Sequence, residues 1–194
     1  MKTSIVLLCL LCIGVSSRAQ SDSSSVSKKI TYFNNLLAGG LFGDSGKGSG
    51  VTISTTHGVR INRFAIGAGI GFDSYFDWKT VPVFGSLSFD FAKVRQHAFF
   101  LQFNGGYAEA SRIERAEEEW LTEYREYGGE MISSMLGYKI NTGKFNLYIL
   151  AGHKYQKAHF SYNPLAPWSS FRAPEVSVEE NMNRIVFQIG FGLH

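Results

Sequence analysis

The sequence is poor in cysteine, proline and charge, and the shortages of cysteine and charge each exclude a class of protein. It has two cysteines and four prolines among 194 residues, and 18% of its residues are charged. Both cysteines, Cys9 and Cys12, fall within the first twelve residues, so a small fold held by disulfides is excluded. The formal net charge is only +3, so no basic surface and no nucleic-acid partner are expected.

The one long apolar run lies at the N-terminus. Lys2 precedes the apolar residues 5–15, and the small residues Ser17 and Ala19 then occupy the −3 and −1 positions of a cleavage site. This arrangement predicts a Sec-type signal peptide over residues 1–19, because the run is too short for a transmembrane helix. An uncleaved N-terminal anchor is the alternative. We expect a flexible, serine-rich lead-in over residues 20–28 and one domain over residues 29–194.

Glycine and aromatic residues are abundant, with 21 Gly and an aromatic share of 14%. From residue 29 onward, apolar residues recur mainly with a period of two, which predicts β-strands. Residues 30–42 have strand composition, although their facing is ambiguous. The sequence therefore predicts eight strands, near residues 30–42, 51–61, 63–76, 81–91, 99–107, 132–140, 145–154 and 184–194.

Short and long connections alternate between these predicted strands. The short ones are near residues 62–63, 93–96 and 141–144. An antiparallel meander places alternate connections at opposite ends, as in small outer-membrane barrels, whose periplasmic turns are short and whose extracellular loops are longer. The predicted long connections are residues 44–49, 77–79, 111–127 and 161–182.

Two closed eight-stranded barrels fit this pattern. A secreted lipocalin-like barrel directs its large apolar side chains inward around a ligand, whereas a transmembrane barrel directs them outward to lipid. The face opposite the large apolar residues carries the glycines of residues 67–71, which suit a narrow barrel interior. The predicted strands also have the length that crosses a bilayer when tilted. We therefore predict an all-β, antiparallel, up-and-down transmembrane barrel, with interior charges at Arg60, Asp73, Asp90, Lys139, Lys154 and Arg184.

Aromatic residues near the strand ends suggest two interfacial belts. Strand propensity alone is the alternative explanation. The residues near the short turns are Phe64, Phe91, Phe99, Tyr138 and Phe145. Those near the long connections are Tyr75, Phe76, Trp78, Tyr107, Tyr155 and Phe160.

The C-terminal segment IVFQIGFGLH resembles the terminal strand of outer-membrane β-barrel proteins, although it ends in His194 rather than phenylalanine. The wider pattern resembles the small eight-stranded barrels of the OmpA/OmpX type. The resemblance implies the outer membrane of a Gram-negative-type bacterium, periplasmic termini and surrounding outer-membrane lipid. It also implies that the barrel-assembly machinery reads the last strand, through Phe187, Ile189, Phe191 and Leu193.

The connection over residues 111–127 is dense in charge. Ile113, Ala116, Trp120 and Tyr124 are spaced along one side of a helix, which predicts a solvated helical loop. The expected role is non-enzymatic: structural, or in contact with a surface ligand or lipopolysaccharide through the loops 111–127 and 161–182. Eight strands leave no open channel. The five histidines show no pair with ligand spacing, so no metal site and no cofactor are expected.

One constellation suggests an enzyme instead. His159 and Ser161 lie two residues apart on one strand face, and Glu175 follows. Such a set can perform acyl transfer, with histidine as base, serine as nucleophile and glutamate as the group that orients the histidine. The pair resembles the His-x-Ser arrangement of outer-membrane lipid A deacylases, although Tyr162 separates Ser161 from Asn163. A lipid A-directed acyl hydrolase is therefore the alternative function.

Overall fold

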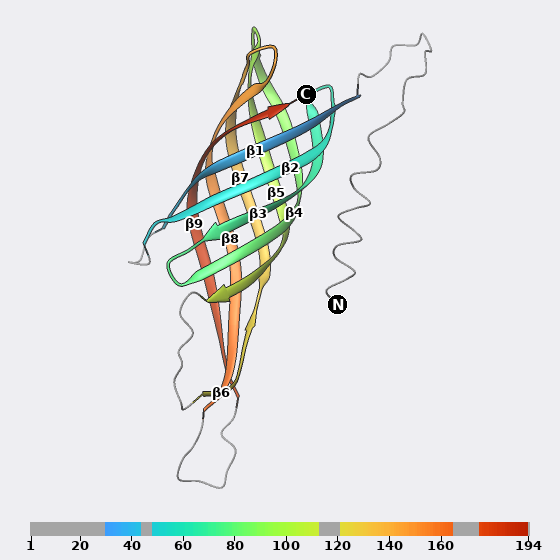
Figure 1. The fold of residues 1–194 in the computed structure, drawn as a ribbon. Coiled ribbons are helices and arrows are strands. Elements are labelled where there is room, and N and C mark those ends of the chain that lie inside the picture. The colour runs from blue at the N-terminus through green and yellow to red at the C-terminus, as the bar shows by residue number, and fades with distance from the viewer. Residues whose placement is uncertain (1–29, 44–47, 113–120, 165–174, 194) are drawn as a thin grey trace.

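The computed structural model describes residues 30–43, 48–112, 121–164 and 175–193. Figure 1 shows antiparallel strands that coil around a common axis. Within the described residues there is no helix long and apolar enough to span a membrane. The strands are β1 (Ile30–Phe42), β2 (Gly50–Ile61), β3 (Phe64–Ser74), β4 (Trp78–Val94), β5 (His97–Arg112), β6 (Leu121–Tyr127), β7 (Gly129–Asn141), β8 (Asn146–Pro164) and β9 (Val176–Leu193).

The sheet closes on itself. Ala38 in β1 lies opposite Ile53 of β2 on one side and opposite Ile189 of β9 on the other. The ring order is β1-β2-β3-β4-β5-β7-β8-β9, and every neighbouring pair is antiparallel. The short strand β6 continues β7 beyond Gly128 and pairs with the far end of β8. The prediction of an eight-stranded, up-and-down antiparallel barrel is confirmed.

Three tight turns join strands at one end of the barrel. Asn62 and Arg95 have φ angles of 57° and 56° in the β2–β3 and β4–β5 turns, and Gly143 has a φ of 88° in the β7–β8 turn. A left-handed backbone is accessible to glycine and asparagine at little cost, so Asn62 and Gly143 suit these turns. The short turns therefore lie together, as the alternation of short and long connections predicts.

The alternation of side chains along the strands separates a lumen from an outer wall. Phe187 of β9 and Ile66 of β3 face outward, with 46% and 60% of their surface exposed. Val186, the residue before Phe187 on β9, faces inward and is buried. In β1, whose facing the sequence leaves ambiguous, Leu37 and Leu41 face inward. Large apolar side chains therefore cover the outside of the barrel.

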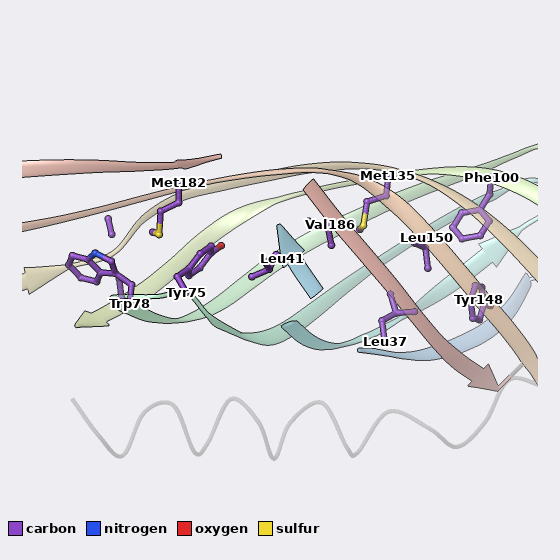
Figure 2. Close-up of a cluster of buried hydrophobic side chains, with 12 residues drawn as sticks. Leu37, Leu41, Tyr75, Trp78, Phe100, Met135, Tyr148, Leu150, Met182 and Val186 are labelled. Carbon is purple, nitrogen blue, oxygen red and sulfur yellow. The ribbon is translucent and has the colours of Figure 1, made fainter. Parts of the chain in front are cut away.

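The lumen holds more bulky apolar side chains than the sequence pattern suggests. Figure 2 shows a cluster along the lumen that extends from Trp78 and Met182 to Phe100 and Tyr148. Inward glycines make room for aromatic rings of this cluster and of a smaller one around Phe84. A Cβ atom at Gly69 would lie 2.5 Å from the ring of Phe84, and one at Gly137 would collide with the ring of Phe100. The expectation of a small and polar interior is therefore incomplete.

Two predicted loops are shorter than expected. β8 and β9 stay paired as far as Tyr162 and Val176, so residues 161–164 and 176–182 of the expected loop 161–182 belong to strands. In the connection 111–127, the helix prediction is wrong for residues 121–127, which form β6. Pairing with β8 overrides the local helical spacing there. Residues 113–120 and 165–174 lie outside the described residues.

Candidate functional site

A first ion network closes the lumen near the tight turns. Asp90 of β4 is buried, and its Oδ2 accepts hydrogen bonds from the Arg60 guanidinium at 2.8 Å and the Lys139 ammonium at 2.7 Å. These three residues come from β2, β4 and β7, so the network ties together distant strands of the ring. A buried carboxylate needs such partners, because an unpaired charge in a low-dielectric interior is costly.

A second network lies toward the long connections. The carboxylate of Asp73 accepts hydrogen bonds from the Lys154 ammonium and, at 3.4 Å, from the Thr80 hydroxyl. Arg184 is buried beside them, with its guanidinium carbon 5.8 Å from the ring centre of Tyr75. Tyr75 lies in the β3–β4 connection, beyond the end of β3, and burial followed by the charge of Asp73 raises the pKa of its phenol. The structure thus places all six residues expected to carry interior charges on the lumen side of the barrel.

Neutral polar groups fill the middle of the lumen. The Asn104 amide accepts a hydrogen bond from Gln102 at 3.1 Å and donates one to the Ser133 hydroxyl at 2.9 Å. Gln188 of β9 donates to Thr52 of β2 at 3.4 Å, over the strand β1 that lies between them. The cavity that these groups line has a volume of about 20 Å³, which leaves room for about one water molecule. Side chains therefore occupy the space that a channel would need.

Aromatic rings and cations cap the lumen at the long-connection end. The indole N–H of Trp78 donates to Glu180 Oε2 at 2.6 Å. The guanidinium carbon of Arg112 lies 4.9 Å from the ring centre of Phe160 and 6.0 Å from that of Trp78. Tyr75, Trp78 and Phe160 were expected in an outer aromatic belt, and that expectation is wrong because all three pack inward. Alternate residues of β4 face inward. Continuing this alternation from Thr80 toward the N-terminus would have identified Trp78 as an inward residue.

Beyond the apolar wall, three strands continue into a region that we call the polar extension: β6, residues 155–164 of β8 and residues 176–183 of β9. The outward side chains of residues 155–159 of β8 and 177–183 of β9 are polar. The ammonium of Lys157 lies 3.5 Å from the carboxylate of Glu179 and 3.9 Å from that of Glu130, and these charges, Glu179 first, raise the pKa of Lys157. The Tyr155 hydroxyl donates to Asn181.

The structure does not assemble the His159, Ser161 and Glu175 set into a hydrogen-bonded triad. The His159 ring stacks on Tyr127, with ring centres 4.6 Å apart and planes at 13°. The Ser161 hydroxyl is buried and has no hydrogen-bond partner among the described residues. Across the β8–β9 ladder, Glu179 lies opposite His159, whereas Glu175 lies beyond the last paired residue. A serine nucleophile requires a base within hydrogen-bond reach.

The residues of the expected assembly signal all lie on the outer wall. Phe187, Ile189, Phe191 and Leu193 are exposed along one face of β9. His194 lies outside the described residues. In the part of the chain that the structure describes, no group of three histidine, cysteine or acidic side chains is placed to hold a metal ion.

Comparisons with known proteins show which solved structures have a similar fold. No protein-family model matches the chain, and neither does any curated protein. The crystal structure of Neisserial surface protein A is similar, with a TM-score of 0.56 and 14% sequence identity, over 85% of this chain and 98% of that one. The chain has the fold of an eight-stranded outer-membrane β-barrel. The translocator domain of the autotransporter NalP from Neisseria meningitidis matches at a TM-score of 0.25 with 10% identity, over 100% of this chain and 95% of that one.

Proposed function

We propose that this protein spans the outer membrane as a closed barrel without a conducting pore, and that it acts at the cell surface through the polar extension. The observation that carries the proposal is the apolar outer wall, to which every strand of the ring contributes. Monomeric soluble proteins rarely expose contiguous apolar patches of more than a few hundred Å². Exposed members, one from each ring strand, are Leu36, Val59, Ile66, Leu87, Phe103, Leu136, Ile149 and Ile189.

The height of this wall suits a bilayer. On β3 the outward apolar residues extend from Phe64 to Phe72, and on β9 from Ile185 to Leu193. Eight residue steps of about 3.3 Å, tilted by about 40°, span about 20 Å, close to the roughly 25 Å apolar band of outer-membrane barrels. The height of the wall therefore matches the thickness of the hydrocarbon layer.

Aromatic pairs near the tight turns support the position of the inner interface. The rings of Phe64 and Phe89 lie 4.7 Å apart between centres, as do those of Phe99 and Tyr138, and Phe91 adds a further contact to Phe99 at 6.3 Å. Aromatic girdles mark the boundary between hydrocarbon and headgroups in such barrels. The short turns of such barrels lie in the periplasm, so we infer that the tight turns face the periplasm and the polar extension faces outward.

The N-terminal segment supports export, and the apolar face of β9 supports recognition by the barrel-assembly machinery. The filled lumen supports a role other than solute passage, since the cavity holds about one water. Outside the lipid, the polar extension presents charged and aromatic groups from three strands. We therefore assign the contact with a surface ligand or lipopolysaccharide to this extension.

Membrane fractionation combined with heat-modifiable gel migration tests the location. We expect the protein in the outer-membrane fraction, migrating faster before heating than after it, because a folded barrel stays compact in detergent. Recovery in the soluble periplasm without a heat shift would overturn the proposal. Planar-bilayer recordings test the closed lumen, and stable ion conductance by the folded barrel would contradict it.

A further inference from the structure

A polar cluster interrupts the apolar outer wall. On β1 and β2, the Tyr32 hydroxyl lies 2.7 Å from His57 Nδ1, and the Thr55 hydroxyl lies 3.2 Å from His57 Nε2. Tyr32 and His57 are exposed on the outer face, and Asn34 lies directly opposite His57 across the ladder. We call Tyr32, Asn34, Thr55 and His57 the wall cluster. Polar and ionisable groups that face hydrocarbon are rare and mark functional positions.

The wall cluster is surrounded by apolar side chains. Along β2, Val59 lies on one side and Ile53 on the other, and both are exposed. His57 is four residues from Ile61, the last outward apolar residue of β2, which places it about 10 Å inside the membrane at the rise and tilt of barrel strands. Lipid headgroups lie at the membrane surface, so they do not reach a cluster at this depth.

Counting polar hydrogens leaves Tyr32, His57 and Thr55 with one donor more than their mutual contacts use. Tyrosine, threonine and neutral histidine each carry one polar hydrogen, which makes three donors. The two contacts to His57 use two of these hydrogens, whichever tautomer is present. The remaining hydrogen, on the hydroxyl of Tyr32 or Thr55, has no acceptor within this trio. The side-chain amide of Asn34 adds one acceptor but two further N–H donors to the wall cluster. Leaving these donors in hydrocarbon is costly, so an external acceptor at the same depth stabilises the arrangement.

A strip of small residues lies beside the wall cluster. Across the β2, β3, β4 and β5 ladders, His57 pairs with Ala68, Ala68 with Gly85, and Gly85 with Gly105. A Cβ atom at Gly105 would meet no atom within 4 Å, so the wall is open there. Small residues allow two membrane-embedded surfaces to approach closely. On the other side of the cluster, by contrast, the outward residues Leu36 and Phe191 are large.

We propose that the wall cluster and the small-residue strip form a dimer interface with a second copy of this chain. This inference rests on the membrane-spanning function proposed above. Two copies inserted in the same direction are related by a twofold axis along the membrane normal, so His57 of one copy meets the same depth of the other. The cluster contains both donors and acceptors and is therefore complementary to itself. An interface centred on His57 also packs Leu36 and Phe191 of one copy against the strip of the other.

Site-specific cross-linking in native outer membranes tests this interface. Cys9 and Cys12 are first replaced by alanine so that each introduced cysteine is unique. Val59→Cys places a thiol beside His57, and we expect a covalent dimer under mild oxidation. Leu136→Cys is the matched control, because β7 lies across the ring from β2. We expect this control to remain monomeric.

Removing the wall cluster supplies the second arm. In the Val59→Cys background, we expect His57→Leu with Thr55→Val to lower the dimer yield roughly tenfold, since polar contacts between membrane segments contribute modestly each and a twofold interface repeats them. Ser134→Ala, which removes an outward hydroxyl from β7, should leave the yield unchanged. Heat-modifiable migration of every variant reports folding separately from dimer formation.

The outcomes distinguish this inference from the proposed function. Soluble, unshifted protein overturns the membrane assignment itself. A folded outer-membrane barrel in which Val59→Cys stays monomeric, or cross-links no more than Leu136→Cys, overturns the dimer alone. An adduct with the mass of a different protein also overturns it, and it shows that the wall cluster has another partner.

Discussion

The indole N–H of Trp78 donates a 2.6 Å hydrogen bond to the carboxylate of Glu180, which joins the first residue of β4 to β9 across the lumen. Arg112 lies against the same indole and against Phe160. This layer closes the barrel between the apolar cluster of the lumen and the polar extension. The barrel is therefore capped by its own strands, within the described part of the chain, rather than by a separate plug.

Replacing Trp78 with phenylalanine tests this cap. The variant keeps an aromatic ring but loses the donor to Glu180, and hydrogen bonds to charged groups contribute about 1.5–3 kcal/mol. We expect a loss of unfolding free energy in that range, measured by urea titration in lipid vesicles. Phe76→Leu is the control, because Phe76 lies two residues earlier in the β3–β4 connection and is exposed. An unchanged unfolding midpoint for Trp78→Phe would show that the cap does not stabilise the barrel.

The Asp90 network predicts a strong effect of removing one carboxylate. Asp90→Asn leaves Arg60 and Lys139 close together without their shared anion. Breaking a buried ion pair in this way costs about 3–5 kcal/mol. We expect this loss in the same urea titration. Glu130→Gln, which removes an exposed partner of Lys157, should change stability by about 1 kcal/mol or less. Equal effects of the two substitutions would contradict the structural role of the network.

Apart from the facing of β1, the ring strands and their facing could be predicted, because their cause is local and periodic. A wall between lipid and a narrow lumen requires opposite side chains at successive positions, and β9 shows this from Ile185 to Leu193. The wall cluster was harder to recognise. His57 and Thr55 interrupt an apolar face, but Tyr32 reaches His57 only through the pairing of β1 with β2.

Other features depend on contacts between residues far apart in sequence. The spacing of apolar residues over 113–124 predicts a helix from local sequence alone. Residues 121–127 are extended because they pair with β8, which the local spacing does not reveal. The volumes in the lumen are matched in the same nonlocal way. Phe100 lies against Gly137 and leaves no room for a larger residue there. Neither segment of the sequence alone predicts this contact. Pattern analysis therefore identifies which side chains face inward without identifying what each one packs against.

The match between Gly137 and Phe100 is itself testable. In Gly137→Ala, the added methyl collides with the Phe100 ring, which is buried and cannot move freely. Overpacking of this kind costs about 1–3 kcal/mol. Shortening the ring partner in Gly137→Ala with Phe100→Leu should recover part of the loss, and a double-mutant cycle measures this coupling. Gly105→Ala adds a methyl to open space on the outer wall, so we expect no loss for the detergent-solubilised monomer. Purely additive losses in the cycle would show that the two residues are not matched.

The position of the hydrocarbon layer predicts where a new charge is tolerated. Leu87 of β4 faces outward in the apolar wall, and arginine at the midplane of a barrel costs about 2–4 kcal/mol. We expect Leu87→Arg to fold less stably in vesicles by this amount. Asn181→Arg, on the polar extension, should fold like the parent. If both variants were equally stable in lipid, the assigned membrane boundary between them would be wrong.

The alternative function as a lipid A-directed hydrolase depends on the Ser161 hydroxyl. That hydroxyl is buried without a hydrogen-bond partner among the described residues, and His159 stacks on Tyr127 instead. We therefore expect mass spectra of lipid A to be identical in cells that produce the parent protein, Ser161→Ala or His159→Gln. A strain that lacks the protein sets the baseline, and heat-modifiable migration verifies that each variant is folded. Loss of an acyl chain from lipid A with the parent protein, abolished by Ser161→Ala, would establish the hydrolase and require His159 to turn from Tyr127 toward the serine during the reaction.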